Sequence, residues 1–280
     1  MPVAVVTDST AYLPAETVQA AGIAVVPLQV IVGGRAYDEG VDIDSRAVAA
    51  ALRAWTPVTT SRPSPQALLD IYTRLADEGA DAVVSMHISA QMSGTYESAV
   101  LAARESPVPT HVVDSRSLGM GLGFLVLEAA ASAHAGAAAN DIAERARRRS
   151  EGVSTYFYVA TLEHLRRGGR IGAAAALLGS ALAIKPLLVL RDGHIEPLEK
   201  VRTASRAVAR LEELAVGAAS GGRADVAVHH LDAATAADAL AARLQSALPA
   251  STLVVGEVGA VVGAHVGPGM LAVVVAPVVP

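Results

Sequence analysis

Short apolar runs alternate with amphipathic segments through the first half of the chain. Val3–Thr7 and Ala82–His87 are runs typical of buried strands, and Pro65–Glu78 is predicted to be a helix. Pro27 interrupts the strand predicted at Val25–Val32, which favours an edge position. Strands separated by helices predict a parallel sheet covered on both faces. The other elements predicted for this half are a strand at His111–Val113 and helices at Pro14–Ala21, Ser45–Trp55, Gly94–Arg104, Leu118–His134 and Asn140–Arg149.

The second half of the chain has a different order of elements. Asp192-Gly193 lies between two apolar runs and is typical of a hairpin turn. A hairpin combined with strand–helix alternation predicts a mixed or antiparallel sheet with helices on one face. We therefore expect an α/β protein of two domains, residues 1–152 and residues 153–280. The elements predicted for this half are strands at Thr155–Thr161, Pro186–Leu190, Ile195–Val201, Val226–His230, Thr252–Val258 and Met270–Ala276 and helices at Ala204–Ala219 and Ala233–Leu248.

The amino-acid composition excludes several structural and functional classes of protein. The 280 residues are 52% hydrophobic, only 3% aromatic, without cysteine and with a net charge of −5. Such a chain is not disordered, and it has no disulfide, cysteine-ligated metal or cysteine nucleophile. Mild acidity and few aromatic residues argue against nucleic acid as a partner. No G-K-[ST] or G-x-S-x-G motif occurs, and adjacent histidines at 229 and 230 would face opposite ways on a strand, so we expect no cofactor and no metal.

Three apolar stretches raise the question of a membrane segment. Met1–Val6 has no basic leader and meets Asp8 at once, which is unlike a signal peptide. Ile171–Leu190 is interrupted by Lys185 and the proline after it, and is interpreted as a short Ala-rich helix followed by a strand. Val258–Pro280 contains too many glycines and prolines for one lipid-facing helix. We therefore expect a cytoplasmic protein without stable membrane insertion.

Four segments are richer in hydroxyl, glycine or cationic groups than structure alone requires. In the second of them, Ser93 stands where a helix begins, and the backbone N–H groups there favour an anion. A helix N-cap is the plain structural alternative for Ser93 and also for Ser64, a solvated turn for the third segment, and a structural histidine for the fourth. The four segments are Thr60–Ser64, Ile88–Tyr96, Leu165–Ile171 and Ala264–Gly269.

The same segments carry a resemblance to the DegV family of bacterial fatty-acid-binding proteins, and the resemblance covers nearly the full chain. Two positions depart from the family pattern: Arg62, where glutamine is usual, and Gly119, where many members have a hydroxyl residue. The residues that carry the resemblance are Thr7-Asp8-Ser9-Thr10, Leu13-Pro14, Pro27-Leu28, Tyr37-Asp38, Thr60-Ser61, Pro63-Ser64, Ser93-Gly94-Thr95-Tyr96, Asp114-Ser115, Tyr156–Ile171, Ile184-Lys185-Pro186, Val201-Arg202-Thr203 and His265–Gly269.

The resemblance implies a carrier rather than a catalyst. Family members have two α/β domains and hold one fatty acid, with its acyl chain in an aliphatic tunnel and its carboxylate at the domain junction. Some present that carboxylate to a separate ATP-dependent fatty acid kinase, which yields an acyl phosphate for phospholipid synthesis. Arg170 and Arg202 match positions near the head group or the kinase-facing surface. The residues expected to bind the carboxylate are Thr60, Ser61, Ser93, Gly94, Thr95 and His265.

Two other hypotheses stay open at this point. A serine hydrolase would use Ser93 as nucleophile, His265 as base and Asp114 as the residue that orients the base. A lipid sensor would bind the same ligand without a kinase partner, and the sequence does not separate it from the carrier.

Overall fold

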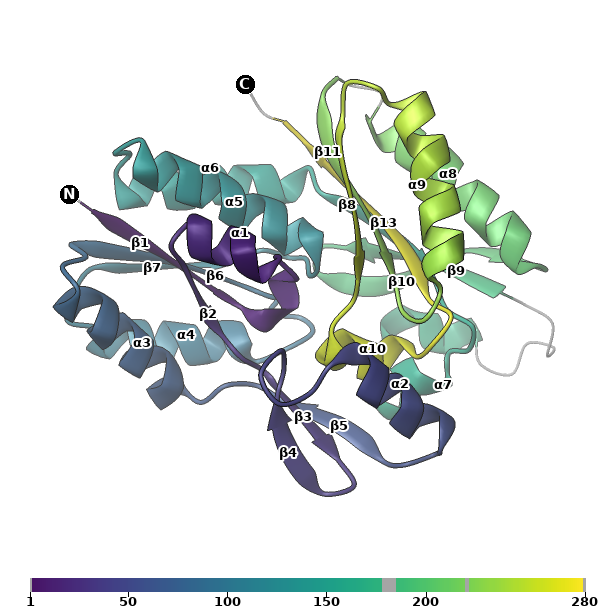
Figure 1. The fold of residues 1–280 in the computed structure, drawn as a ribbon, viewed down its shortest axis with the longest axis horizontal. Coiled ribbons are helices and arrows are strands. Elements are labelled where there is room, and N and C mark those ends of the chain that lie inside the picture. Colours follow the sequence, from purple (N-terminus) through teal and green to yellow (C-terminus); the bar gives the residue numbers. More distant parts are fainter. Residues whose placement is uncertain (1, 178–184, 220–221, 279–280) are drawn as a thin grey trace. The chain divides into compact units, whose positions relative to one another are not determined.

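The chain folds into two compact units, each formed by two stretches of sequence (Figure 1). The residues that the computed structural model describes are 2–177, 185–219 and 222–278. The first unit consists of Met1–Gln29 and Ser61–Glu151, and the second of Val30–Thr60 and Gly152–Pro280.

A four-stranded parallel sheet with the order β2-β1-β6-β7 forms the centre of the first unit. Val5 of β1 lies opposite Ile23 of β2 on one side and Val84 of β6 on the other. All six residues of β6 are buried, as expected for a central strand. The elements of this unit are β1 (Val3–Asp8), η1 (Ser9–Ala11), α1 (Ala15–Ala20), β2 (Ile23–Val26), α3 (Pro65–Asp77), β6 (Ala82–His87), α4 (Thr95–Glu105), β7 (Thr110–Asp114), α5 (Met120–His134) and α6 (Ala139–Glu151).

Helices cover both faces of this parallel sheet. Leu68 of α3 and Ala99 of α4 pack with Val6 and Val83 of the strands, while α5 and α6 contact β1 and β6 from the opposite side (Figure 1). The start of α3 follows from its sequence, since the side chain of Ser64 accepts the backbone N–H of the third helical residue. The predicted parallel sheet with helices on both faces is confirmed.

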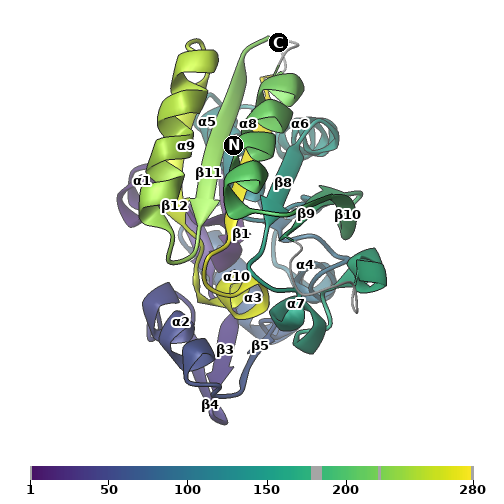
Figure 2. The same cartoon turned by 90° about the vertical axis from the view of Figure 1, so that its right-hand side faces the viewer.

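The second unit contains a six-stranded mixed sheet with the order β10-β9-β8-β13-β11-β12. Only β11 and β12 are parallel neighbours, and the other strand pairs are antiparallel. Leu211 of α8 and Leu240 of α9 pack on Val226 and Val273 of this sheet, and the two helices lie along it (Figure 2). The predicted mixed sheet with helices is confirmed. The further elements are β8 (Ser154–Tyr158), α7 (Glu163–Arg167), η2 (Gly172–Leu177), β9 (Lys185–Arg191), β10 (His194–Val201), α8 (Ala204–Ala219), β11 (Ala224–His230), α9 (Ala234–Ala247), β12 (Thr252–Glu257), α10 (Ala260–Val266) and β13 (Leu271–Pro277).

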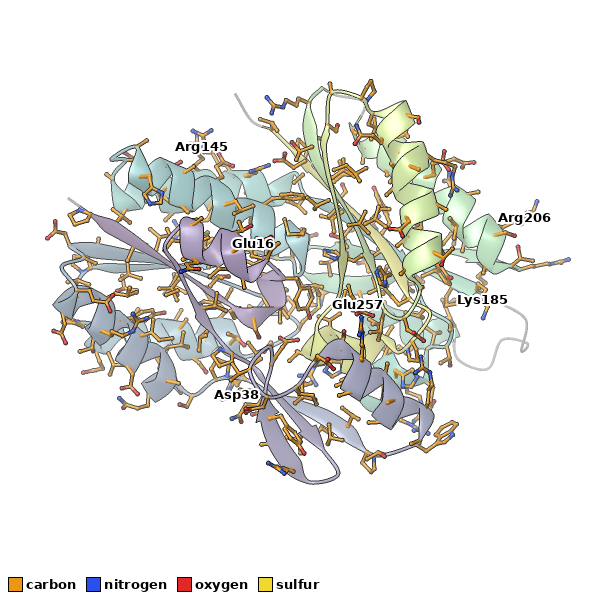
Figure 3. All side chains as sticks on the ribbon, viewed as in Figure 1. Glu16, Asp38, Arg145, Lys185, Arg206 and Glu257 are labelled. Carbon is orange, nitrogen blue, oxygen red and sulfur yellow. The ribbon has the colours of Figure 1, made fainter. Side chains whose placement is uncertain are left out.

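A three-stranded sheet and one helix from the first half of the chain belong to the second unit. Ser45 at the start of α2 donates its hydroxyl hydrogen to Glu257 at the end of β12, at 2.9 Å, and Figure 3 labels this glutamate beside the helix. Arg53 forms an ion pair with Asp232, and α2 packs against α10 (Figure 2). These elements are β3 (Gln29–Val32), β4 (Arg35–Asp38), α2 (Ser45–Arg53) and β5 (Val58–Ser61), in the sheet order β4-β3-β5.

Several predicted elements differ from the structure. The single strand predicted at Val25–Val32 is wrong, because Pro27 separates β2 and β3, which join different sheets. The predicted division at residue 152 places Val30–Thr60 in the first domain. In the structure this segment packs with the second unit instead. The predicted Ala-rich helix is a 3₁₀ turn over Gly172–Leu177, and residues 178–184 lie outside the described residues. In the part of the chain that the structure describes, no helix combines the length and the apolar character needed to cross a bilayer.

Candidate functional site

The first turn of α4 carries a pair of hydroxyl groups. Ser93 Oγ and Thr95 Oγ1 form a hydrogen bond of 2.8 Å. Gly94 is the N-cap of the helix and no side chain caps it, so the alternative of Ser93 as N-cap is wrong. Among the described residues, no hydrogen bond occupies the backbone N–H groups of Gly94 and Thr95. Two N–H groups, a hydroxyl and the positive end of the helix dipole are therefore available to an anion.

A buried hydrogen-bond network fixes the ends of β1 and β6, from which the loop to α4 starts. His87 Nδ1 lies 3.1 Å from Asp8 Oδ2, and His87 Nε2 lies 2.7 Å from Ser85 Oγ, which also accepts the hydroxyl of Tyr72. Asp8 accepts the backbone N–H of Ile88 at 2.9 Å. Ser85, His87 and Asp8 are 0% exposed, so this set of Ser, His and Asp side chains is structural. Its only signal in the sequence is that Ser85 and His87 share one face of a strand.

His265 of α10 contacts Thr60 of β5 within the second unit. His265 Nε2 lies 2.9 Å from Thr60 Oγ1. The Nδ1 atom is shielded from solvent and has no hydrogen-bond partner among the described residues. Burial, together with the charge of Arg170, lowers the pKa of His265 to about 4. The imidazole is therefore neutral at pH 7 and can take part in hydrogen bonds without a charge of its own.

A glycine after each of the helices α7 and α10 leaves space for a histidine ring from the other helix. A Cβ on Gly168, which follows α7, would lie 1.9 Å from His265 Nδ1. A Cβ on Gly267, which follows α10, would lie 2.1 Å from His164 Cδ2. Each histidine ring thus occupies space that only glycine leaves open. Arg170 donates from Nη1 to the carbonyl of Gly168 at 2.6 Å, which holds its positive charge near His265. We name these two His–Gly contacts the α7–α10 clasp.

Ser61 is the partly exposed last residue of β5, and Arg202 lies in an exposed turn. Ser61 donates its hydroxyl hydrogen to its neighbour's carbonyl, that of Arg62, at 3.3 Å. Arg202 is exposed in the turn before α8 and forms no hydrogen bond or ion pair with the described residues. Arg206, one turn further along, projects outward from α8 (Figure 3).

The three residues of the hydrolase hypothesis have other partners. Ser93 is bonded to the Thr95 hydroxyl and His265 to Thr60. Asp114 Oδ1 accepts the backbone N–H groups of Ala90 and Arg116, at 3.2 and 2.8 Å. Nothing in these contacts favours a nucleophile, a base and an orienting carboxylate in one site.

The adjacent histidines of β11 make separate backbone contacts. His229 Nδ1 lies 3.2 Å from the carbonyl of Gly256, and burial lowers the pKa of His229 to about 4. His230 Nδ1 accepts the N–H of Ala233 at 3.4 Å. Over residues 2–177, 185–219 and 222–278, no group of three or more His, Asp or Glu side chains is placed to hold a metal ion.

Comparison with known proteins gives matches along the whole chain. A family model described as "Uncharacterised protein, DegV family" matches residues 2–278. A DegV domain-containing protein of Streptomyces coelicolor is 57% identical over 274 residues, which is 98% of each chain. The structure described as "Fatty Acid Binding of a DegV family Protein from Thermus thermophilus" is 36% identical, has a TM-score of 0.94 and covers 99% of this chain and 100% of that chain. A second structure, "DegV, a fatty acid binding protein from Bacillus subtilis", is 34% identical, with a TM-score of 0.90 and 99% coverage of both chains.

Proposed function

The chain belongs to the DegV family, and we propose that it binds one long-chain fatty acid as a carrier, without catalysing a reaction. The observation that carries this proposal is the likeness to the fatty-acid-binding protein of Thermus thermophilus, at a TM-score of 0.94 over 99% of this chain. The unoccupied N–H groups at the start of α4 supply the carboxylate contacts that such a ligand needs.

In this proposal the carboxylate is bound by groups from two stretches of sequence. The Ser93 hydroxyl and the N–H groups of Gly94 and Thr95 act from α4. The Thr60 hydroxyl and the neutral ring of His265 act from their hydrogen-bonded pair, and Ser61 adds a further hydroxyl. The donors fix the orientation of the ligand, whereas an aliphatic tunnel supplies most of the affinity, at about 0.8 kcal/mol for each buried methylene.

Extraction of the purified protein with organic solvent, followed by mass spectrometry, tests the proposed ligand. We expect one fatty acid per chain, and the delipidated protein should take up added fatty acid to the same ratio. A protein that carries no acyl chain and takes up none would contradict the proposed function.

Ser93→Ala tests the carboxylate contact. Loss of one hydrogen bond to a charged group costs about 1.5–3 kcal/mol, which corresponds to about 10- to 100-fold weaker binding. Titration of delipidated protein with a fluorescent fatty acid measures this loss. Ser132→Ala, which removes a helix-surface hydroxyl of α5 in the same unit, is the control and should bind as the wild type does. Equal affinity of both variants would remove Ser93 from the site.

We further propose that the bound fatty acid is presented to a separate kinase subunit. Arg202, exposed and without a partner among the described residues, is available for such a contact, and Arg170 lies beside His265. With ATP and the cognate kinase, we expect acyl phosphate, and Arg202→Ala should lower turnover while the fatty acid affinity stays unchanged. Fatty acid binding without phosphorylation by any cognate kinase would instead indicate the lipid-sensor hypothesis.

A further inference from the structure

Arg62 lies against the first turn of α4, within the first unit. Its Nη1 donates to the carbonyl of Gly94 at 3.3 Å, and a Cβ on Gly94 would lie 1.8 Å from the same nitrogen. The φ of Gly94 is −72°, which any residue adopts, so the lack of a side chain matters here for the space beside the helix and not for conformation. The guanidinium of Arg62 occupies that space.

The charge of Arg62 has no counter-charge among the described residues. Glu97, the acidic residue in the first turn of α4, is exposed and forms no ion pair with it. A guanidinium carries five N–H donors and is always protonated in proteins. Because Arg62 is exposed and makes a single long bond to a neutral carbonyl, most of its donors and its charge face solvent, where a ligand can reach them.

We propose that Arg62 is a charged head-group residue that pairs with the carboxylate of the fatty acid, an inference that rests on the proposed function. Its guanidinium stands next to Gly94, whose N–H group is free for an anion, as is that of Thr95. The planar fork of donors matches the two oxygens of a carboxylate, and pairs of this kind are stronger than neutral hydrogen bonds. Arg62 thus selects ligands with a charged end over uncharged lipids of the same chain length.

The test compares oleic acid with oleyl alcohol, which has the same chain and no charge. Delipidated full-length wild type, Arg62→Gln, Arg62→Lys and Arg104→Gln are titrated with each ligand. Arg104 is an exposed arginine at the far end of α4, so its replacement removes the same charge at the end of the helix away from Arg62. We expect Arg62→Gln to weaken oleic acid binding about tenfold, with a smaller effect at high salt, and to leave oleyl alcohol unchanged. Arg62→Lys should recover part of the loss, and Arg104→Gln should match the wild type.

Two results would overturn the role of Arg62 alone. In the first, wild type and Arg62→Gln bind oleic acid equally well. In the second, Arg62→Gln loses oleic acid and oleyl alcohol to the same extent, which indicates a structural role. A wild type that binds neither ligand contradicts the proposed function itself, and the inference about Arg62 is then also overturned.

Discussion

At the scale of single residues, two buried histidines make stability depend on pH. His265 and His229 each have a pKa of about 4 in the folded protein, lowered by burial, against about 6.5 in an unfolded chain. Between these two values the unfolded chain binds protons that the folded chain does not. The free energy of unfolding therefore falls as the pH drops from about 6.5 towards 4, and it keeps the full contribution above that window.

Replacing one of these histidines should make the free energy of unfolding depend less on pH below about 6.5. Between pH 6.5 and pH 4, the free energy of unfolding of His265→Gln should fall by up to about 3 kcal/mol less than that of the wild type. The reason is that the unfolded variant has no imidazole at this position to bind a proton. Urea unfolding at a series of pH values measures the difference. His134→Gln, at an exposed position of α5, is the control and should follow the wild-type curve. Identical slopes for His265→Gln and the wild type would contradict the argument.

At the scale of elements, the α7–α10 clasp makes the position of the His265 ring depend on the space left by a glycine at the end of α7. Gly168 has a φ of −74°, so alanine there has no backbone strain, yet its Cβ would overlap the ring of His265. We expect Gly168→Ala to displace this ring, break its bond to Thr60 and destabilise the protein by about 1–3 kcal/mol, as overpacking does. Thermal unfolding measures the loss, and the ring resonances of His265 show the displacement.

A second glycine serves as the control for this prediction. A Cβ on Gly217, within α8, would meet no atom within 4 Å. Gly217→Ala should therefore stabilise the protein by about 0.5–1 kcal/mol and leave the ring resonances of His265 unchanged. If Gly168→Ala behaved in the same way as this control, the clasp would have no energetic role.

The elements that sequence patterns predict well are those whose own residues carry a clear pattern or a cap. β6 and α3 follow from an apolar run and from a capped amphipathic segment, and both are confirmed. The apolar pattern does not separate β2 from β3, because a proline inside an apolar run gives no information on whether the flanking strands share a sheet. The pattern does not predict α10, because its seven residues are almost uniformly apolar and show no helical period.

At the scale of the whole molecule, long-range packing decides what the sequence does not show. The resemblance selected Thr60 and His265 separately, but their hydrogen bond joins residues that are 205 positions apart. Gly168 and Gly267 carry no chemical signal in the sequence, because their role is the space left for a ring from another helix. Val30–Thr60 joins the second unit for the same reason, since its partners, including the N–H of Val261 that Glu39 accepts at 2.7 Å, lie far along the chain.

A ligand that binds the folded chain and not the unfolded chain should stabilise the protein. If the proposed carboxylate contacts are made, a fatty acid at 100 times its dissociation constant adds about 2.7 kcal/mol to the stability of the ligated chain. For a protein of this size, that corresponds to a rise of about 5 °C in Tm. Calorimetry of delipidated protein with added oleic acid should show the whole transition moving upwards, and the shift should shrink in Ser93→Ala and in His265→Gln alike. A shift that either variant keeps in full would contradict the contact of that residue with the carboxylate, because a lost contact must lower the affinity that produces the shift.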